Sequence, residues 1–527
     1  MAHCNSRRSD RARHASGPAP LLNGQRGLRG RLRARALSRS TIFGRWADRG
    51  TTDRPAARVT GRLLTRASWA LLLLSGAGVL MASPAIATEN FEVASQGCPM
   101  AHCDPRMSDQ VRLDPPATPV AEIWSRNELI SEQAGTEFGL GCSGNGTVAA
   151  CSYFSDTDAL VVYDYDGNRL WTSGNLFNDT ARNSVPMLSA VGEVIMADDQ
   201  NVIRFGPTGG IVWQSMLPFG GRPVSPVMTQ DGIVILATVS GPIYAFDSVD
   251  GMLLGTLFVR ETPGDPGFFE TINTPVVKEN RIYVSMHHQV GGIPDSDFLA
   301  WLVAIDVDRA GPEVLSVAWH FEFGGFSGAS PTRVGSTIYF DGDRPEPGTG
   351  PMDPHLFAVI DTGLGPVELW RKPTVSRLLA SVNLDPRFLS GLWHFTQYSP
   401  FLVRRGLFTG RLKKILNVNT LLGEPGGFVV SSATSMAGFG ANPVMLVTAL
   451  KLSGGPCYLM AVDLLANSLL WKLKVTDFPE DFAASQFPIL TGSEGPRVIL
   501  TTFNGGARAV GTVSGETAAA AGPRLGH

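Results

Sequence analysis

The sequence predicts an all-β fold: an eight-bladed β-propeller, with seven blades as the alternative, closed by pairing of its N- and C-terminal strands. Three observations lead to this prediction. A strand–turn–strand unit recurs eight times, a Ser/Thr-Pro pair stands before several copies, and the chain begins and ends its repeats with incomplete copies. Intervals of 41 to 59 residues between copies are typical of repeat architectures.

The repeated unit has the pattern of a β-hairpin that ends in a large aromatic residue. Its clearest copy is CYLMAVDLLANSLLW, residues 457–471. Asp opens the turn, and Gly or Asn supplies a residue with positive φ. One hairpin cannot bury its Trp alone, so we expect each Trp to pack against the next sheet. The turn-opening positions of the eight copies are Asp164, Phe205, Asp247, Asp306, Asp361, Gly406, Asp463 and Gly511.

The incomplete copies at the two ends complete each other. PVAEIW, which ends at Trp124, lacks a preceding hairpin strand, and the C-terminal RVILTTFNGGARAVGTVSGE supplies strands without a Trp. Pairing them in one blade removes the open edge and gives eight blades. A second recurring element, placed before a short strand, supports the count: Ser184-Val185-Pro186, Ser225-Pro226, Thr274-Pro275, Ser330-Pro331 and Phe487-Pro488.

The first 87 residues differ in composition from the rest. Residues 1–66 hold 16 Arg and three Asp, and we interpret them as disordered or as upstream of the true translation start; a basic arm for nucleic acid is the alternative. Residues 67–87 have the order of an export signal, with a retained membrane anchor as the alternative. We expect residues 88–118 to be an extension or linker over the surface, 119–516 the propeller and 517–527 a disordered tail.

Removal of residues 1–87 leaves an acidic protein. The whole chain has 44 Lys and Arg and 47 Asp and Glu; subtracting 16 and 3 leaves 28 and 44, a net charge of −16. Such a surface repels phosphate backbones, so we expect no nucleic-acid partner. The expected protein is periplasmic or extracellular and monomeric, with protein partners and no membrane span after signal cleavage.

Five cysteines remain after cleavage, and disulfides are expected in an exported protein. The first two could close a small loop, and the next two flank a Gly-Asn-Gly turn that would set them opposite each other. The predicted pairs are Cys98 with Cys103 and Cys142 with Cys151. Cys457 is left as a buried thiol on a strand. Metal binding by the first pair with His102 is the alternative, although no second ligand pair has a recognisable spacing.

Two insertions at the same point of consecutive repeats supply a candidate metal site. Carboxylates and imidazoles of this kind ligate divalent cations, and solvated polar loops are the alternative interpretation. The candidate residues are His287, His288, Asp295, Asp297, Asp341, Asp343, Asp353 and His355. The sequence assigns no catalytic residue and no cofactor-binding residue.

A basic segment interrupts the acidic chain. RRGLFTGRLKK, residues 404–414, contains five basic residues and no acidic one. It is interpreted either as a docking patch for an acidic partner or as a solvated edge.

The unit, an apolar strand and D-x-x-x-G-x-x-x-W with an upstream Ser/Thr-Pro, resembles the repeat of PQQ-type eight-bladed propellers. This quinoprotein alcohol dehydrogenase-like superfamily is matched over residues 120–515, and the chain is similar in size to its BamB outer-membrane assembly factors. Quinoprotein dehydrogenases typically carry adjacent cysteines, a calcium or lanthanide ion and a catalytic Asp, whereas this chain has no Cys-Cys pair. Unlike the usual BamB lipoproteins, it has no lipobox before Cys98.

The resemblance thus implies a shared scaffold with either of two functions. We predict a binding or assembly scaffold for protein partners. The alternative is a PQQ-dependent or related oxidoreductase with PQQ and calcium in the central channel.

Overall fold

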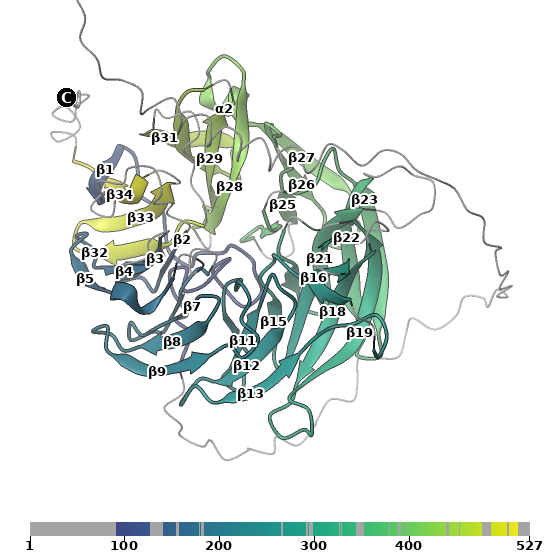
Figure 1. Ribbon diagram of the computed structural model, residues 1–527. Coiled ribbons are helices and arrows are strands. Elements are labelled where there is room, and N and C mark those ends of the chain that lie inside the picture. The colour runs from purple at the N-terminus through teal and green to yellow at the C-terminus, as the bar shows by residue number, and fades with distance from the viewer. Residues whose placement is uncertain are drawn as a thin grey trace, which may run out of the picture. The chain divides into compact units, whose positions relative to one another are not determined.

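The computed structural model divides the chain into two units, Met1–Ser83 and Pro84–His527. All residues that the structure describes lie in the second unit (Figure 1). They are residues 91–126, 141–153, 158–178, 180, 184–264, 267–290, 293–294, 299–325, 327, 329–343, 353–378, 380–387, 391–396, 398–438, 442–452, 454–476, 486–502 and 505–514. The predicted Arg-rich segment 1–66, export signal 67–87 and tail 517–527 lie outside these residues.

The regular secondary structure of the described chain is nearly all β, arranged as antiparallel sheets (Figure 1). The first three sheets have four strands each, taken in chain order. They comprise β2 (Gly141–Gly144), β3 (Ala149–Ser152), β4 (Leu160–Tyr163) and β5 (Arg169–Thr172); β6 (Met187–Leu188), β7 (Val194–Ala197), β8 (Asn201–Phe205) and β9 (Ile211–Met216); and β10 (Val227–Met228), β11 (Ile233–Ala237), β12 (Ile243–Asp247) and β13 (Leu253–Leu257).

The next sheet has ten strands and consists of two units joined at one point. The first unit holds β14 (Phe268–Glu270), β15 (Val276–Lys278), β16 (Arg281–Val290), β17 (Ile293–Pro294), β18 (Leu299–Val307) and β19 (Leu315–Gly324). The second holds β20 (Thr332–Val334), β21 (Thr337–Asp343), β22 (Pro354–Asp361) and β23 (Pro366–Pro373). A single residue pair, Gly324 with Asp343, joins β19 to β21, so each unit has its own set of four consecutive paired strands.

Three further four-stranded sheets complete the described chain. They comprise β24 (Asn383–Leu384), β25 (Leu392–His394), β26 (Phe401–Arg405) and β27 (Leu412–Asn417); β28 (Phe428–Ala437), β29 (Val444–Lys451), β30 (Cys457–Asp463) and β31 (Ser468–Thr476); and β32 (Ile489–Gly492), β33 (Gly495–Thr502), β34 (Gly505–Thr512) and β1 (Val120–Arg126). In the last sheet β1 runs antiparallel to β34, from Val120 opposite Thr512 to Arg126 opposite Ala507. The two ends of the repeat region therefore meet in one sheet.

Helical structure is confined to short pieces in the described residues. A 3₁₀ turn, η1, covers Gly174–Leu176, and helix α2 covers Val418–Leu422 directly after β27. The side chain of Asn417 caps α2 by accepting a hydrogen bond from the backbone N–H of Asn419. Among the described residues, no helix has the length and apolar character needed to span a membrane.

The repeated hairpin forms as its residue types require. In the hairpin between β30 and β31, the carboxylate of Asp463 accepts hydrogen bonds from the backbone N–H groups of Leu465 at 2.7 Å and Ala466 at 2.9 Å. Asn467 then takes the left-handed conformation with φ 56°. Trp471 on β31 is buried. The expected roles of the Asp, Asn and Trp in this hairpin are thus confirmed.

Each outer-strand Trp joins its sheet to the next one, as expected. Trp370 of β23, for example, donates its indole N–H to the carbonyl of Leu407 at 2.7 Å. Its ring packs against Gly410, where a Cβ would lie only 2.8 Å from a ring carbon. The glycines at Gly167, Gly209 and Gly251 face a Trp in the same way. These contacts explain why the hairpin turns pair a Gly with a Trp from the preceding sheet.

The Ser/Thr-Pro pairs join the inner ends of neighbouring sheets. The hydroxyl of Ser225 accepts a hydrogen bond from the backbone N–H of Val185 at 3.0 Å, and that of Ser330 accepts one from Thr274 at 2.9 Å. Both hydroxyls are buried and out of reach of water, so these bonds supply the hydrogen-bond partners that the buried polar groups need.

Both predicted disulfides are present. Cys98 is bonded to Cys103, and Cys142 of β2 is bonded to Cys151, its direct partner on β3. Cys457 on β30 is a buried thiol, as expected.

Candidate functional site

The sequence analysis expected the segment before β1 to run over the surface, and this was wrong. The described part of the segment lies between the sheets (Figure 1). Its apolar side chains Met100, Met107 and Val111 are fully buried. The segment shows no apolar periodicity because it is irregular and bonds to several different sheets along its length. We call residues 98–111 the central segment.

Main-chain hydrogen bonds attach the central segment to a strand near the start of each of six different sheets or sheet units. Its carbonyl groups mostly act as acceptors for the N–H groups of these strands. The bonds are Gly144 of β2 with Cys98, Leu188 of β6 to Pro99, Val277 of β15 to Pro105, Arg333 of β20 to Arg106, Leu384 of β24 to Ser108, and Met436 of β28 to Asp109. A segment bonded to six innermost strands occupies the space that these strands surround.

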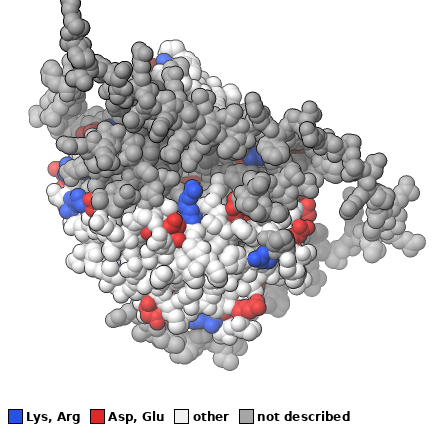
Figure 2. Space-filling model, viewed as in Figure 1, with Lys and Arg blue, Asp and Glu red and all other residues white. Residues whose placement is uncertain are grey.

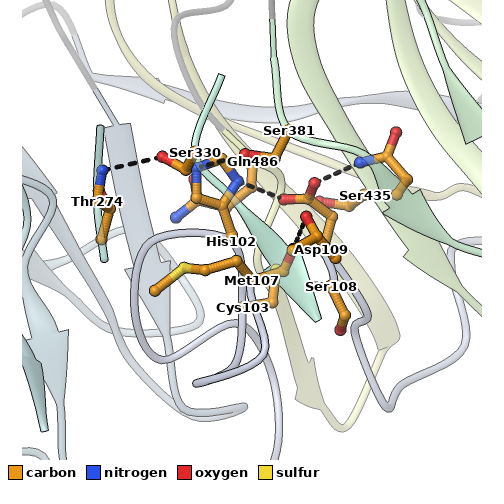
Figure 3. Close-up of polar contacts among 12 residues, drawn as sticks. His102, Cys103, Met107, Ser108, Asp109, Thr274, Ser330, Ser381, Ser435 and Gln486 are labelled. Carbon is orange, nitrogen blue, oxygen red and sulfur yellow. Dashed lines mark hydrogen bonds and ion pairs between the residues drawn. The ribbon is translucent and has the colours of Figure 1, made fainter. Parts of the chain in front are cut away.

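His102 is the centre of a polar network in this segment (Figure 3). Its Nδ1 lies 3.0 Å from Oδ1 of Asp109, and its Nε2 lies 3.2 Å from the hydroxyl of Ser381. The other carboxylate oxygen of Asp109 accepts a hydrogen bond from the side-chain amide of Asn383. His102 and Asp109 both have positive φ, 57° and 55°. The network thus fixes the segment to residues on and just before β24.

Burial dominates the electrostatics of the network. It raises the pKa of the Asp109 carboxyl, and the neighbouring His102 ring opposes this shift by favouring the carboxylate. The side chain of Asp109 is 3% exposed, whereas that of His102 is 21% exposed. The imidazole is therefore the part of the network that water reaches.

A second set of bonds fixes the turn of the central segment. One carboxylate oxygen of Asp104 accepts from the backbone N–H groups of Arg106 at 2.9 Å and Ser108 at 3.2 Å. The other accepts from the Ser108 hydroxyl and the Arg106 guanidinium, each at 2.7 Å. Together with the Cys98–Cys103 disulfide, these bonds hold the turn in one conformation.

Ser381, His102 and Asp109 follow the order of a nucleophile, a base and an orienting carboxylate. Chemistry on a substrate would require an accessible nucleophile, but Ser381 is completely buried. The geometry instead fits a structural role, in which the three side chains satisfy one another's hydrogen bonds. Sequence reasoning weighed His102 only as a metal ligand; its partners Asp109 and Ser381 lie 7 and 279 residues away along the chain.

The predicted metal-site residues are divided between the two units of the ten-stranded sheet. His287 and His288 lie on β16, Asp341 and Asp343 on β21, and Asp353 and His355 at or just before the start of β22. Asp295 and Asp297 lie outside the described residues. The structure therefore brings the β21 and β22 residues of the second insertion together.

The described members of the predicted site have other partners. His287 lies 2.7 Å from Glu270, and Asp343 forms an ion pair with Arg377 at 2.6 Å. Asp341 accepts hydrogen bonds from the Ser327 hydroxyl at 2.7 Å and the Leu378 backbone at 3.0 Å. His288 packs beside the ring of Phe269, and the ring of His355 bonds the carbonyl of Asp353 at 2.8 Å. Within the described ranges, no group of three His, Cys, Asp or Glu is placed to hold a metal ion. The complete eight-residue site stays a prediction.

The alternative function, an oxidoreductase, predicts PQQ and calcium in the central channel. The central segment fills the space between the innermost strands with buried side chains such as Met100 and Met107. These side chains occupy space that the alternative function assigned to the quinone. The Cys98–Cys103 disulfide spans five positions in sequence and so differs from the adjacent-cysteine ring of quinoprotein dehydrogenases.

Comparison with known proteins finds no matching family model and no matching curated protein. Solved structures do match. A europium-containing methanol dehydrogenase has a TM-score of 0.50 and 10% identity, covering 77% of this chain and 89% of its own. BamB from Moraxella catarrhalis has a TM-score of 0.47 and 11% identity, covering 74% and 97%. The Dos1 propeller has a TM-score of 0.49 and 9% identity, covering 74% and 95%. At these identities the likeness shows the fold alone, a β-propeller.

Proposed function

We propose that the mature chain is an exported, monomeric, eight-bladed propeller of PQQ-type repeats that acts as a binding or assembly scaffold for protein partners. Six four-stranded sheets and the two units of the ten-stranded sheet account for eight blades. Pairing of β1 with β34 supports closure of the ring in the last blade.

Occupation of the centre by residues 98–111 is the observation that carries this proposal. In the alternative, an oxidoreductase, PQQ and calcium would need that space. Here backbone bonds to six innermost strands, a buried disulfide and the His102 network hold protein atoms in it. Partners must then bind to the outer surface.

The outer surface is suited to selective protein contacts. Acidic and basic side chains lie close together on the face shown in Figure 2, without a large area of one sign over the described residues. The acidic excess of residues 88–527 disfavours nucleic acid, and the two disulfides are compatible with export.

Thermal unfolding of the mature chain, from Thr88 onward, tests the choice between scaffold and oxidoreductase. The protein is heated with PQQ plus calcium over a range of concentrations, with PQQ alone and calcium alone as controls. A ligand that binds only the folded state at 100 times its Kd adds about 2.7 kcal/mol of stability.

We expect no dependence of the melting temperature on PQQ and calcium together. A concentration-dependent rise seen only with both would show that the folded protein binds this cofactor pair and would overturn the scaffold proposal. Covalent crosslinking of the intact protein in its own compartment should, in turn, yield defined protein adducts.

A further inference from the structure

The outer strand β27 lacks the Trp that joins most of the sheets to the next one; β13 lacks it too, with Gly255 at that position. On the outer strand of these hairpins, the Trp is the residue that pairs with the neighbouring strand next to a β-bulge. Trp471 lies opposite Ala461 in this way, and Trp370 lies opposite Ala358. In the sheet of β24 to β27 the same position, opposite Arg404, is Lys414. Because Lys414 is exposed, it does not pack against the next sheet as the Trp residues do.

The turn of the next sheet that would face this residue, between β30 and β31, lacks the glycine found in such turns. Four of the turns that receive a Trp carry a glycine whose Cβ would strike the indole ring, Gly410 among them. The turn between β30 and β31 has Asn467 in that place, with φ 56°. Both sides of the interface between the β24–β27 and β28–β31 sheets therefore lack the Trp–Gly contact.

The exposed stretch around Lys414 combines basic and apolar side chains. Residues 411–415, RLKKI, are all exposed, and Leu412 and Ile415 are 48% and 49% exposed. Among the described residues, the charged groups of Arg411 and Lys414 have no hydrogen-bond or ion-pair partner. Residues 386–423 contain six basic residues and no acidic one, although residues 88–527 carry a net charge of −16.

Strand β27 is also the edge of its sheet, since the described strands are ordered β24-β25-β26-β27. An edge strand presents unpaired main-chain N–H and C=O groups that can pair with another extended segment. Charged side chains, Lys above all, protect edge strands from unwanted pairing, so the lysines of β27 restrict the pairing to a segment that brings acidic residues. Here the exposed apolar side chains beside the charges favour a segment that brings both acidic and apolar residues.

We propose that β27 binds an extended acidic segment of a protein partner, which adds to the sheet as a further strand. Main-chain hydrogen bonds would supply affinity. Carboxylates facing Arg411 and Lys414, and apolar side chains over Leu412 and Ile415, would supply selectivity. This inference rests on the proposed scaffold function and names its binding surface.

The test uses the mature protein and a fluorescent octapeptide in which Asp or Glu alternates with Val or Leu. Binding is measured by fluorescence anisotropy at about 0.05 and 0.15 M salt, because exposed charges are screened over roughly 10 Å near 0.1 M. We expect saturable binding that weakens with salt and is lost for a peptide whose alternate amides are N-methylated. A peptide with Lys in place of the acids should not bind.

Two variants locate the site. Arg411→Glu with Lys414→Glu should weaken binding at least about tenfold, because two attractions become repulsions. The matched control, Arg112→Glu with Arg260→Glu, makes the same change in net charge at exposed positions elsewhere and should leave affinity unchanged. Lys414→Trp with Asn467→Gly should create the Trp–Gly contact at this interface and should also remove binding. Circular dichroism checks the folding of each variant.

Equal loss in the control pair, or binding that survives N-methylation, would overturn strand addition at β27. Binding to vesicles of anionic phosphatidylglycerol, without binding to the peptide, would overturn it in favour of a membrane surface. Failure of the peptide while protein crosslinks persist would refute the β27 site alone. Failure of crosslinks together with a PQQ-dependent stabilisation would refute the scaffold function itself.

Discussion

His394 should make the protein sensitive to mild acid. Its side chain is buried on β25, and its Nε2 accepts a hydrogen bond from the Nε of Arg405 at 3.1 Å. Burial lowers the pKa of His394 to about 3, and the charge of Arg405 adds to the shift. The folded protein therefore holds this imidazole neutral.

The size of the effect follows from the difference between the folded and unfolded pKa values. An unfolded His has a pKa near ~6.5, so below that pH the unfolded state binds a proton that the folded state refuses. Stability is thus present above pH ~6.5, falls as the pH drops through that value and stops falling near 3. At about 1.4 kcal/mol per pH unit, His394 lowers the free energy of unfolding by about 2 kcal/mol at pH ~5.

Reversible urea unfolding at pH 7 and pH 5, followed by Trp fluorescence, measures this loss. His394→Gln is the matched variant, because Gln can still accept from Arg405 but does not titrate in this range. Wild type should lose about 2 kcal/mol more than the variant between the two pH values. An equal loss in both proteins would refute the assignment of the acid sensitivity to His394.

Four further changes test the contacts between and within the sheets. Trp370→Ala should lower the free energy of unfolding by about 3–5 kcal/mol in urea titration, because a buried ring is lost. Gly410→Ala should lower it by about 1–3 kcal/mol, because its Cβ would meet that ring. Unchanged unfolding midpoints would contradict the inter-sheet contact. Replacing Cys98 and Cys103 together by Ala should cost about 2 kcal/mol from loop closure and speed proteolysis before β1; equal cleavage rates would argue against the fixed turn. Asp361→Ala should cost about 3–5 kcal/mol in the same titration, since it removes one partner of Arg281 and leaves the buried donors of Tyr283 and Trp319 without their acceptor. A loss below ~1 kcal/mol would show that these donors find other partners.

The hairpins could be read from the sequence because their signals are local. Asp463, Asn467 and Trp471 lie within nine residues, and each has a residue-type preference that depends on its own turn or strand. The disulfide between Cys142 and Cys151 was equally local, since a short hairpin sets the two residues opposite each other. Register across these hairpins follows from the turn itself.

The polar network at His102 could not be read in this way. Its partner Ser381 comes from a distant part of the chain, and the surrounding residues have no periodic pattern. The metal-site prediction grouped residues by similar positions in two repeats. It could not foresee that Asp343 faces Arg377 and that His287 faces Glu270, because ion pairs depend on which neighbouring loop supplies the opposite charge.

The sequence by itself determined the repeating hairpin, the Trp positions and the terminal strands that pair, because alternation, turn chemistry and spacing act over a few residues. Only the tertiary structure decided that residues 98–111 fill the centre, since that position depends on hydrogen bonds to six strands that are far apart in the sequence, from Gly144 to Met436. It also decided that β27 is an exposed basic edge, because whether Lys414 is covered depends on the sheet beside it.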